Sequence, residues 1–539
     1  IPMLTNQFTL DLRYKQIGDL FAGGGGASCA IEMATGLYVD FAVNHDAQAI
    51  LMHTINHPQT RHYQTDVYEV DPYSACNGRP IGLLHLSPDC THHSQAAGGQ
   101  PRDNITRSLS WVGKRWAAQV RPDIITLENV EQITRWERLV AKRDKATGRV
   151  IKLDKTVAAP GERVPVQNQF LVPDTKHVGK CWRKFVGELE KLGYAVEWRT
   201  LVAADYGAPT TRKRLFLVAR CDGRPIVWPE QTHFKNPTKG QKKWRSAAEC
   251  IDWSVQGKSI FEREKPLADA TMRRIVKGIK KFVLDNPDPF IVKFRGERNG
   301  NHSVSAVLIN AAHGEGNGHT KRRGIGSRNI GDALGTVTAS GSGGHAVAAA
   351  YLMQANGGFN TVHGKSAIDP MTTITNSGSQ QQLVSACLIR QFGASTGSDI
   401  AAPMGTVMTD GGGGKTSLAV CELGEAEERA LKVAGFLMQN ADLPISDLSE
   451  KERLDLVTVH INNTPHYIVD IMLRMLLPKE LYKAQGFPDG YIFDRDCFGQ
   501  PLTKTAQVRM CGNSVSPPPM VALIKANYNP QVQQEICVA

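Results

Sequence analysis

The chain lacks three features that would place it in a membrane or in an oxidising compartment. It has no run of about 18 apolar residues, so no membrane-spanning helix is expected. Its first residues do not show a charged segment followed by an apolar one, so no secretory signal is expected. Its 11 cysteines include no C-x-x-C pair, which argues against a zinc site or a disulfide framework and predicts no bound metal. We therefore expect a cytoplasmic protein.

Charges of the two signs are not balanced. The 539 residues include 63 Lys and Arg against 52 Asp and Glu, which gives a net charge of +11. Excess positive charge favours a polyanion partner, because Lys and Arg that neutralise phosphates release counterions. A soluble protein that is basic but binds no polyanion would have the same totals. Net charge alone therefore does not decide between a polyanion-binding protein and a basic protein without such a partner.

Short apolar runs alternate with helix-like segments in the first part of the chain and again near residue 200. The strand-like runs are Gln16–Phe21, Tyr38–Asn44, Gly82–Leu86, Asp123–Glu128 and Arg214–Ala219, and a helix-like run covers Cys181–Leu192. Such alternation predicts an α/β domain with a mostly parallel sheet. Ligands of open α/β sheets bind at the carboxyl ends of the strands, and polar residues follow several of these runs.

Two regions depart from this alternation. Residues 131–180 contain 11 Lys and Arg against 6 Asp and Glu, and we expect an insertion of strands and loops there. Contact with a DNA backbone and a solvated surface excursion both remain open for it. Residues 290–420 hold 23 of the 50 glycines and a degenerate repeat, Leu334–Thr338, Met371–Thr375 and Met404–Met408. The repeat predicts a separate β-rich domain, after which helix-like patterning should resume from about residue 465.

A glycine-rich loop, Asp19-Leu-Phe-Ala-Gly-Gly-Gly-Gly26, follows the first strand-like run. Its glycines let backbone approach a ligand at a strand-to-helix turn. The loop does not match G-x-G-x-x-G, because Ser28 or Cys29 stands at the last glycine position, which disfavours a nicotinamide oxidoreductase. Asn44-His-Asp46 and Asp66-Val67 follow later runs, where they can bind a ribose and an adenine amino group or simply cap turns.

A cysteine stands in the polar loop Ser87-Pro-Asp-Cys-Thr-His-His-Ser94, after another strand-like run. Cysteine at such a place can act as a nucleophile, although a buried structural thiol is the more common role. The flanking polar residues argue against a dry core site. Glu128-Asn-Val130 ends a further run and offers a candidate acid, and Arg212-Lys-Arg214 begins another with alternating cations or a basic surface edge.

Taken in order, these motifs resemble the DNA cytosine-5 methyltransferase family of bacterial or phage type. Four segments resemble family patterns. Asp19–Gly26 resembles D-L-F-A-G-x-G-G, and Pro88–Cys90 with Ser94 resembles P-P-C-Q-x-F-S. Glu128–Val130 is identical to E-N-V, and Gly207–Arg214 resembles G-x-P-Q-x-R-x-R. Two motifs near the end of the family pattern are matched by Arg474–Leu476 with Pro478, Glu480 and Ala484–Pro488, and by Gly512–Val515 with Pro517. The resemblance covers about residues 1–265 and 465–539.

The resemblance implies a Rossmann-like class I methyltransferase sheet with helices on both faces, plus a smaller β-rich target recognition domain. The catalytic α/β domain would cover residues 1–285 with a basic insertion at about 131–180. A glycine-rich target recognition domain would cover 286–435, and residues 436–539 would return to the catalytic domain. Glycine loops Gly341–Gly344 and Gly411–Gly414 would approach the DNA grooves, unless they are flexible loops remote from DNA. The nearby cations that would contact DNA are Arg322, Arg323, Arg328, Lys365, Arg390 and Lys415.

The resemblance also implies a reaction. Cys90 would attack C6 of a cytosine flipped out of duplex DNA, and the methyl group of S-adenosylmethionine would pass to C5. Glu128 would protonate N3, Asn129 would orient Glu128, and Arg212 and Arg214 would hold the base carbonyl and a phosphate. The cofactor would lie against Phe21, Gly23, Gly25, Asn44, His45, Asp66, Val67, Pro88, Leu109, Asn513 and Val515. We expect a monomer that acts on double-stranded DNA, with a cognate restriction endonuclease as a further partner that the family allows.

Several positions depart from the family pattern. Asn44 replaces Glu, Asp89 replaces Pro, Thr91 and His93 replace Gln and Phe, and Thr210 replaces Gln. An RNA cytosine-5 methyltransferase and a non-catalytic DNA-binding protein on the same scaffold therefore remain alternatives. An amino-methyltransferase is disfavoured, because Ser87-Pro-Asp-Cys90 lacks the aromatic residue of a D/N/S-P-P-Y/F loop and Val70-Asp-Pro-Tyr73 lacks the second proline.

Overall fold

The computed structural model describes residues 15–89, 107–287 except 254, 256 and 268, 427–440, 448–461 and 464–530, together with strands between 291 and 424. The chain forms two compact units. The first unit comprises Ile1–Leu201, Arg214–Glu230 and Met520–Ala539, and the second comprises Val202–Lys213 and Gln231–Pro519.

A seven-stranded sheet organises the first unit. Its strand order is β3-β2-β1-β4-β5-β10-β8; β1 to β5 pair in parallel, and β10 runs antiparallel to β5. The strands are β1 (Gln16–Leu20), β2 (Phe41–Val43), β3 (Arg61–Tyr63), β4 (Ile81–Leu86), β5 (Ile124–Asn129), β8 (Ala195–Val202) and β10 (Lys213–Arg220). Five of them coincide with the strand-like runs expected from the sequence. The strand order reverses between β1 and β4, which is where open α/β sheets bind ligands.

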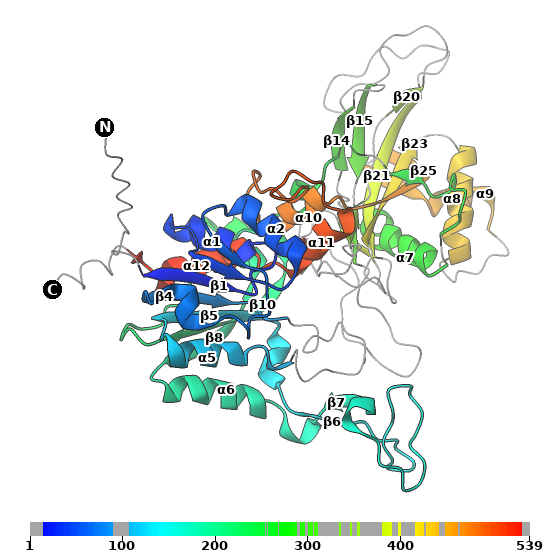
Figure 1. Cartoon of the computed structure of the whole chain (residues 1–539). Helices are drawn as coiled ribbons and strands as arrows, with labels where there is room; N and C mark the ends of the chain where they lie inside the picture. Colours follow the sequence, from blue (N-terminus) through cyan, green and yellow to red (C-terminus); the bar gives the residue numbers. More distant parts are fainter. Residues whose placement is uncertain are drawn as a thin grey trace, which may run out of the picture. The chain divides into compact units, whose positions relative to one another are not determined.

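Helices cover both faces of this sheet, as expected for a class I methyltransferase fold. Figure 1 shows α1 and α2 on one side of the sheet and α5 and α6 on the other. The bounds are α1 (Gly26–Thr35), α2 (Ala47–Asn56), α3 (Pro72–Cys76), α5 (Trp111–Gln119), α6 (Lys180–Lys191) and α12 (Pro517–Asn527). Asp46 caps α2 by accepting from the backbone N–H groups of Gln48 and Ala49, which fixes the chain as it leaves β2.

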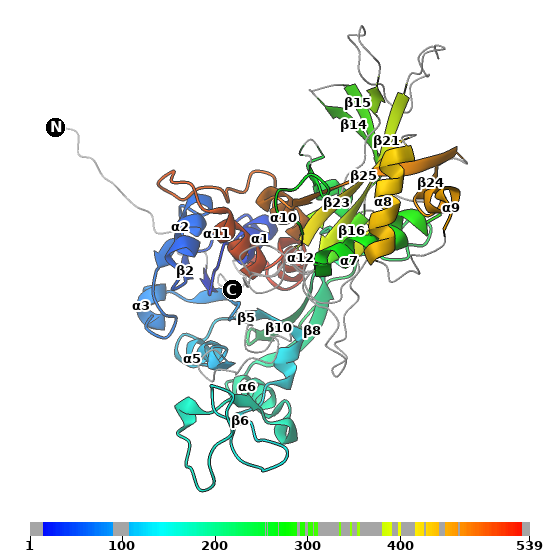
Figure 2. The ribbon, with the colours of Figure 1, turned by 90° about the vertical axis from the view of Figure 1, so that its right-hand side faces the viewer.

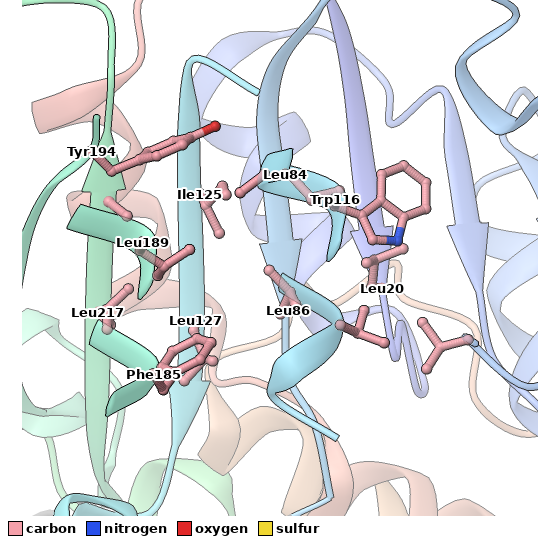
Figure 3. Packing of buried hydrophobic residues seen from close by; sticks show 14 of the residues in the cluster. Leu20, Leu84, Leu86, Trp116, Ile125, Leu127, Phe185, Leu189, Tyr194 and Leu217 are labelled. Carbon is pink, nitrogen blue, oxygen red and sulfur yellow. The ribbon is translucent and has the colours of Figure 1, made fainter. Parts of the chain in front are cut away.

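The main core lies between the sheet and α3, α5 and α6. Leu20, Leu84, Leu86, Ile125 and Leu127 project from neighbouring strands toward these helices, as Figure 3 shows. Strands β4 and β5 are buried along their whole length, which explains their nearly continuous apolar sequences.

Close packing in this core depends on one glycine. The rings of Phe41 and Trp116 stack with centroids 5.4 Å apart, and the Phe41 ring lies over Gly18. A Cβ atom on Gly18 would lie 2.3 Å from Cζ of Phe41, so the ring occupies the space of a missing side chain.

Residues 138–174 form an extension of the first unit that we call the arm. It contains β6 (Leu139–Ala141) and β7 (Leu171–Pro173), which pair antiparallel, and short bridges such as Arg143–Val150. The arm extends beyond α6 in both Figure 1 and Figure 2. The expectation of strands and loops within 131–180 is therefore confirmed.

The second unit contains an eleven-stranded sheet. Its strands are β13 (Lys258–Ser259), β14 (Ile291–Gly296), β15 (Gly300–Ser305), β16 (Val307–Asn310), β19 (His345–Val347), β20 (Met353–Ala355), β21 (Gln380–Arg390), β22 (Gly397–Asp399), β23 (Thr416–Gly424), β24 (Thr458–Ile461) and β25 (Thr464–Met475). Its helices are α7 (Asp269–Ile279), α8 (Glu427–Asn440), α9 (Glu450–Asp455), α10 (Pro478–Gln485) and α11 (Lys504–Asn513). Figure 2 shows α7 and α8 beside the strands of this sheet.

One expectation for this region is wrong. Helical structure does not resume at residue 465, because residues 464–475 form β25 between β23 and β13, and the next helix starts at Pro478. Ile468, Val469, Ile471, Met472 and Leu473 are all buried, so both faces of the strand are covered. A strand buried on both faces loses the alternation that separates it from a buried helix.

Only part of the glycine-rich repeat falls on described residues. Leu334–Gly335 of the first copy forms β18, which pairs in parallel with β9 (Thr210–Thr211). The copies at 371–375 and 404–408 and the loops Gly341–Gly344 and Gly411–Gly414 lie outside the described residues.

Candidate active site

The glycine-rich loop forms a tight turn between β1 and α1. Phe21, Gly23 and Gly25 all have positive φ, at 64°, 54° and 85°. The Ala22 N–H donates to the carbonyl of Val43 and the Gly25 N–H to that of Ala22, which fixes the turn beside β2. A positive φ at a non-glycine residue such as Phe21 costs about 1 kcal/mol or more and is concentrated at functional sites. The turn therefore suits close approach of a ligand to backbone.

A chain of buried polar groups lies beneath this turn. The Ser28 hydroxyl donates to Oδ2 of Asp19 at 2.7 Å and lies 2.9 Å from Nε2 of His53, whose Nδ1 is 2.8 Å from Nε2 of His62. Since Ser28 donates to Asp19, it accepts from His53, and His53 accepts from His62. Burial raises the pKa of Asp19 to about 7 and lowers that of His53 well below its usual value.

Sequence reasoning did not assign this chain of groups. Asp19 belongs to the glycine-rich motif Asp19–Gly26, but its partners come from α1, α2 and β3, and nothing in the sequence spacing links them. The Oδ1 atom of Asp19 is buried, and none of the described residues forms a hydrogen bond with it. The effect of the chain is to hold the start of α1 against the end of β1.

The residues expected to hold the cofactor's ribose and adenine follow β2 and β3. Oδ1 of Asn44 accepts from the Asp46 N–H at 2.8 Å, so the side chain presents its amide nitrogen as a donor. His45 is exposed. Asp66 is exposed and accepts from the Tyr68 N–H, and Val67 is buried.

The ends of β4 and β5 are joined by a buried hydrogen bond. Nδ2 of Asn129 donates to the carbonyl of Pro88 at 2.9 Å, and Oδ1 of Asn129 accepts from the Val130 N–H. Glu128 is 7% exposed, and its Oε1 lies 3.2 Å from Nε of Arg214, which comes from the adjacent strand β10. The structure thus brings together Pro88, Glu128, Asn129 and Arg214.

Cys90 lies outside the described residues, as do Thr91 and His93. Asp89 is described and exposed. Leu109 is half-buried, and its carbonyl accepts from the Val112 N–H at the start of α5. Within the described part of the chain, no three His, Cys, Asp or Glu side chains are placed to hold a metal ion, and no helix is long and apolar enough to cross a membrane.

The other residues expected at the site from the sequence belong to the second unit. Arg212 is 3% exposed, and its Nη1 donates to the carbonyl of Gly512 at 3.1 Å. Its backbone N–H donates to the hydroxyl of buried Thr210, the residue that replaces glutamine. Asn513 is exposed at the end of α11, and Val515 is buried. The two motifs that contain Arg212 and Gly512 are therefore in direct contact although 300 residues apart in sequence.

Further contacts join the late motifs to each other. Nε2 of Gln485 donates to the carbonyl of Cys511, and the Ser516 hydroxyl donates to the carbonyl of Gln485. Arg474 and Glu480 form a bidentate ion pair at 2.8 and 3.0 Å. The segments around Gln485 and Cys511 are thus bonded to each other and hold the start of the loop that follows α11.

Comparisons with known proteins find DNA methylases and methyltransferases that are similar to this chain. The model of the family described as C-5 cytosine-specific DNA methylase matches residues 15–145 and 170–282. The chain is 25% identical over 224 residues to the Type II methyltransferase M.AquIA of a Picosynechococcus species, a span of 41% of this chain and 77% of that protein. It is 25% identical over 229 residues to the Type II methyltransferase M.SacI of Streptomyces achromogenes, a span of 40% of this chain and 50% of that protein.

Among solved structures, the methyltransferase EhMeth of Entamoeba histolytica aligns with 95% of this chain and 97% of its own, at 11% identity and a TM-score of 0.42. So low a score carries no argument about activity. The family match covers β1 to β5, β8 and β10, which carry the glycine-rich turn, Glu128, Asn129 and Arg214. Residues 15–145 and 170–282, which carry the catalytic sheet, therefore match the C-5 cytosine-specific DNA methylase family.

Proposed function

We propose that this protein transfers a methyl group from S-adenosylmethionine to carbon 5 of a cytosine flipped out of duplex DNA, at specific sequences. The hydrogen bond from Asn129 to the carbonyl of Pro88 carries the proposal. Pro88 stands two residues before Cys90, and Asn129 follows Glu128 directly. The bond therefore ties the segment that leads to the nucleophile to the strand end that carries the acid, and both groups must act on one ring.

The reaction needs both groups because C5 of cytosine is a poor nucleophile. The Cys90 thiolate forms a bond to C6, the electron pair of the C5–C6 double bond is released into the ring, and N3 accepts a proton from Glu128. C5 then has enamine character and takes the methyl group, which the bound cofactor supplies as an electrophile. Loss of the C5 proton to solvent restores the C5–C6 double bond and expels the thiolate, and N3 returns its proton to Glu128.

The two arginines have different places in this scheme. Arg214 contacts Glu128 directly and can keep the carboxyl group oriented toward the ring. Arg212 is held by the carbonyl of Gly512 and can donate to the cytosine carbonyl oxygen or to a phosphate. Buried guanidinium groups that are already held in place stabilise developing negative charge without reorganisation.

The described residues fit the proposed cofactor. The turn at Phe21–Gly25 has the positive φ values of a backbone that a ligand can approach closely, and it lies beside the switch point of the sheet. Asn44 offers amide hydrogens to a ribose oxygen, and the exposed carboxylate of Asp66 can accept from an adenine amino group. Phe21, Gly23, Gly25, His45, Val67, Pro88, Leu109, Asn513 and Val515 complete the proposed binding set.

The test is methyl transfer from labelled S-adenosylmethionine to mixed-sequence duplex DNA, followed by nucleoside mass spectrometry. We expect 5-methylcytosine from the native protein and none from Cys90→Ala, with Cys497→Ala as a control that keeps activity. N4-methylcytosine or N6-methyladenine would contradict the nucleophilic mechanism. Methylation of RNA in preference to DNA would contradict the substrate.

A second readout does not depend on turnover. Duplexes with 5-fluorocytosine at the target should trap a covalent protein–DNA adduct, because fluorine cannot leave C5 as the proton does. The adduct should survive denaturing electrophoresis for the native protein and for Cys497→Ala, and should be absent for Cys90→Ala. Sequencing the methylated product would give the target site.

A further inference from the structure

We propose that the arm, residues 138–174, is a second DNA-binding surface that holds the phosphate backbone without regard to sequence. This inference rests on the proposed function, because it takes duplex DNA as the substrate. The arm has eight Lys and Arg against four Asp and Glu, a net charge of +4 in 37 residues. Such an excess provides non-specific, salt-dependent affinity for nucleic acid.

The arm leaves the fold at the edge that carries the chemistry. Strand β5 ends at Asn129, one residue after Glu128, and only residues 130–137, which include the short turn Glu131–Arg135, separate it from the arm. DNA whose flipped base reaches Glu128 must pass close to this edge of the sheet. The arm is therefore attached where a neighbouring stretch of backbone can reach it.

The base of the arm is fixed in the protein core. Glu137 and Arg107 form an ion pair at 3.2 Å, and both side chains are over 90% buried. The Trp136 ring lies 5.8 Å from the ring of Trp111 and 6.4 Å from that of Phe185, centroid to centroid. At the stem, Asp174 accepts from Arg138 and pairs with His177. A fixed base lets charges at the tip act from defined positions.

The acidic residues of the arm are occupied in its own turns. Asp144 accepts from the backbone N–H and hydroxyl of Thr147, and Asp154 does the same with Thr156. Glu162 accepts from the Ala159 N–H and pairs with Lys152. The negative charges thus serve local structure and lie close to the backbone.

Most of the basic residues remain at the surface. Lys142, Arg143, Lys145, Lys155 and Arg163 are all exposed. Lysine and arginine side chains on a turn-rich hairpin can reach phosphates along a groove edge and fix the register of a duplex. The family model that matches the rest of the catalytic sheet leaves out residues 146–169, so these residues add to the shared fold.

The arm also exposes apolar side chains. Leu153, Val157 and Val166 are 48%, 38% and 63% exposed, which alone would suit a protein partner. The excess of positive charge favours DNA, because a protein surface would have to be strongly acidic to match it. The following experiment separates the two.

The test compares two triple variants. The arm variant is Arg143→Gln, Lys145→Gln and Lys155→Gln, and its control is Arg183→Gln, Lys184→Gln and Lys191→Gln, three exposed cations on α6. The dissociation constant for a random-sequence duplex is measured against salt concentration. Each lost phosphate contact reduces the magnitude of the slope of log K against log salt concentration by about 0.9. We therefore expect the magnitude of the slope to decrease by about two to three for the arm variant and to change little for the control.

Methyl transfer distinguishes the failure of this inference from that of the proposed function. At saturating DNA the arm variant should keep the native rate, because the chemistry does not involve these side chains. An unchanged salt slope in the arm variant would overturn the DNA-binding role, even if the native protein methylates DNA. A variant with Leu153→Ser and Val166→Ser tests the apolar alternative. If this variant loses affinity and the arm variant does not, the arm acts through an apolar contact and the DNA-binding role is wrong.

Discussion

The carboxyl edge of the seven-stranded sheet and the arm both carry many charged groups, but they use them in opposite ways. Asp19 and Glu128 on the strands and His53 on the adjacent helix α2 are at most 7% exposed, and each has a polar side-chain partner. In the arm, most of the cations are exposed and the acids close turns. Buried charges depend on particular partners, whereas exposed charges act through their number and sign. The same substitution should therefore have very different effects in the two regions.

The largest contrast should appear when a carboxyl group is neutralised. Glu128→Gln removes the proposed proton donor, and we expect kcat to fall by about 10²–10⁴-fold, the usual contribution of general acid catalysis. Glu162→Gln is the matched change in the arm and should leave kcat within about twofold. Both are measured by steady-state methyl transfer at saturating DNA. Equal rates for the two variants would remove Glu128 from the mechanism.

Ion pairs should differ nearly as much. Arg107→Leu leaves Glu137 buried without its partner and should lower the free energy of unfolding by about 3–5 kcal/mol. Lys152→Gln breaks the exposed pair with Glu162 and should cost about 0–1 kcal/mol. Urea unfolding measures both. The double variant Arg107→Leu and Glu137→Leu should recover most of the loss, and if it does not, the cost came from packing rather than from the unpaired charge.

A smaller effect concerns the pH dependence of stability. His85 on β4 is buried, its Nδ1 lies 2.9 Å from the Thr126 hydroxyl on β5, and burial lowers its pKa to about 3. The unfolded chain binds a proton at this histidine below about pH 6.5, whereas the folded chain does not until about pH 3. The folded state therefore loses about 1.4 kcal/mol per pH unit as pH falls through this window, and the loss is absent above it.

The variant His85→Leu with Thr126→Val removes both polar groups together. Between pH 6 and pH 4, its free energy of unfolding should fall less steeply than that of the native protein. The two slopes should differ by about 1.4 kcal/mol per pH unit, which corresponds to the uptake of one proton. Urea unfolding across this range, with His45→Leu at an exposed site as control, measures the difference. Identical slopes would show that His85 is not held neutral by burial.

Much of the first unit could be predicted, because buried parallel strands leave apolar runs and ligands gather where those runs end. Glu128 and Asn129 were found in this way, and their contacts with Arg214 and Pro88 agree with it. The contacts of His53 with Ser28 and His62 could not be predicted, since they require the order of the strands in space. Strand β25 was missed because it is apolar on both faces.

The late motifs illustrate a different limit. Their residues could be recognised by resemblance. The hydrogen bond between Arg212 and the carbonyl of Gly512, however, requires the fold to bring together two residues that are 300 positions apart in the sequence. Local patterns contain no information on such a pairing. The domain boundaries at 285 and 435 remain predictions, although β13 and β25, outside these limits, share a sheet with strands inside them.

The ring of Phe41 over Gly18 has a consequence for the divergence of this protein. A methyl group on residue 18 would lie 2.3 Å from Cζ and 2.5 Å from Cε2 of that ring, and 2.9 Å from Cδ1 of Leu84. Position 18 can therefore gain a side chain only when position 41 carries a smaller residue and the Leu84 side chain shifts. Either change alone passes through a strained or cavity-containing intermediate. The two positions should therefore be inherited as a pair among descendants of this chain, and a mutagenesis library should recover Gly18→Ala chiefly in clones that also carry a smaller residue at position 41.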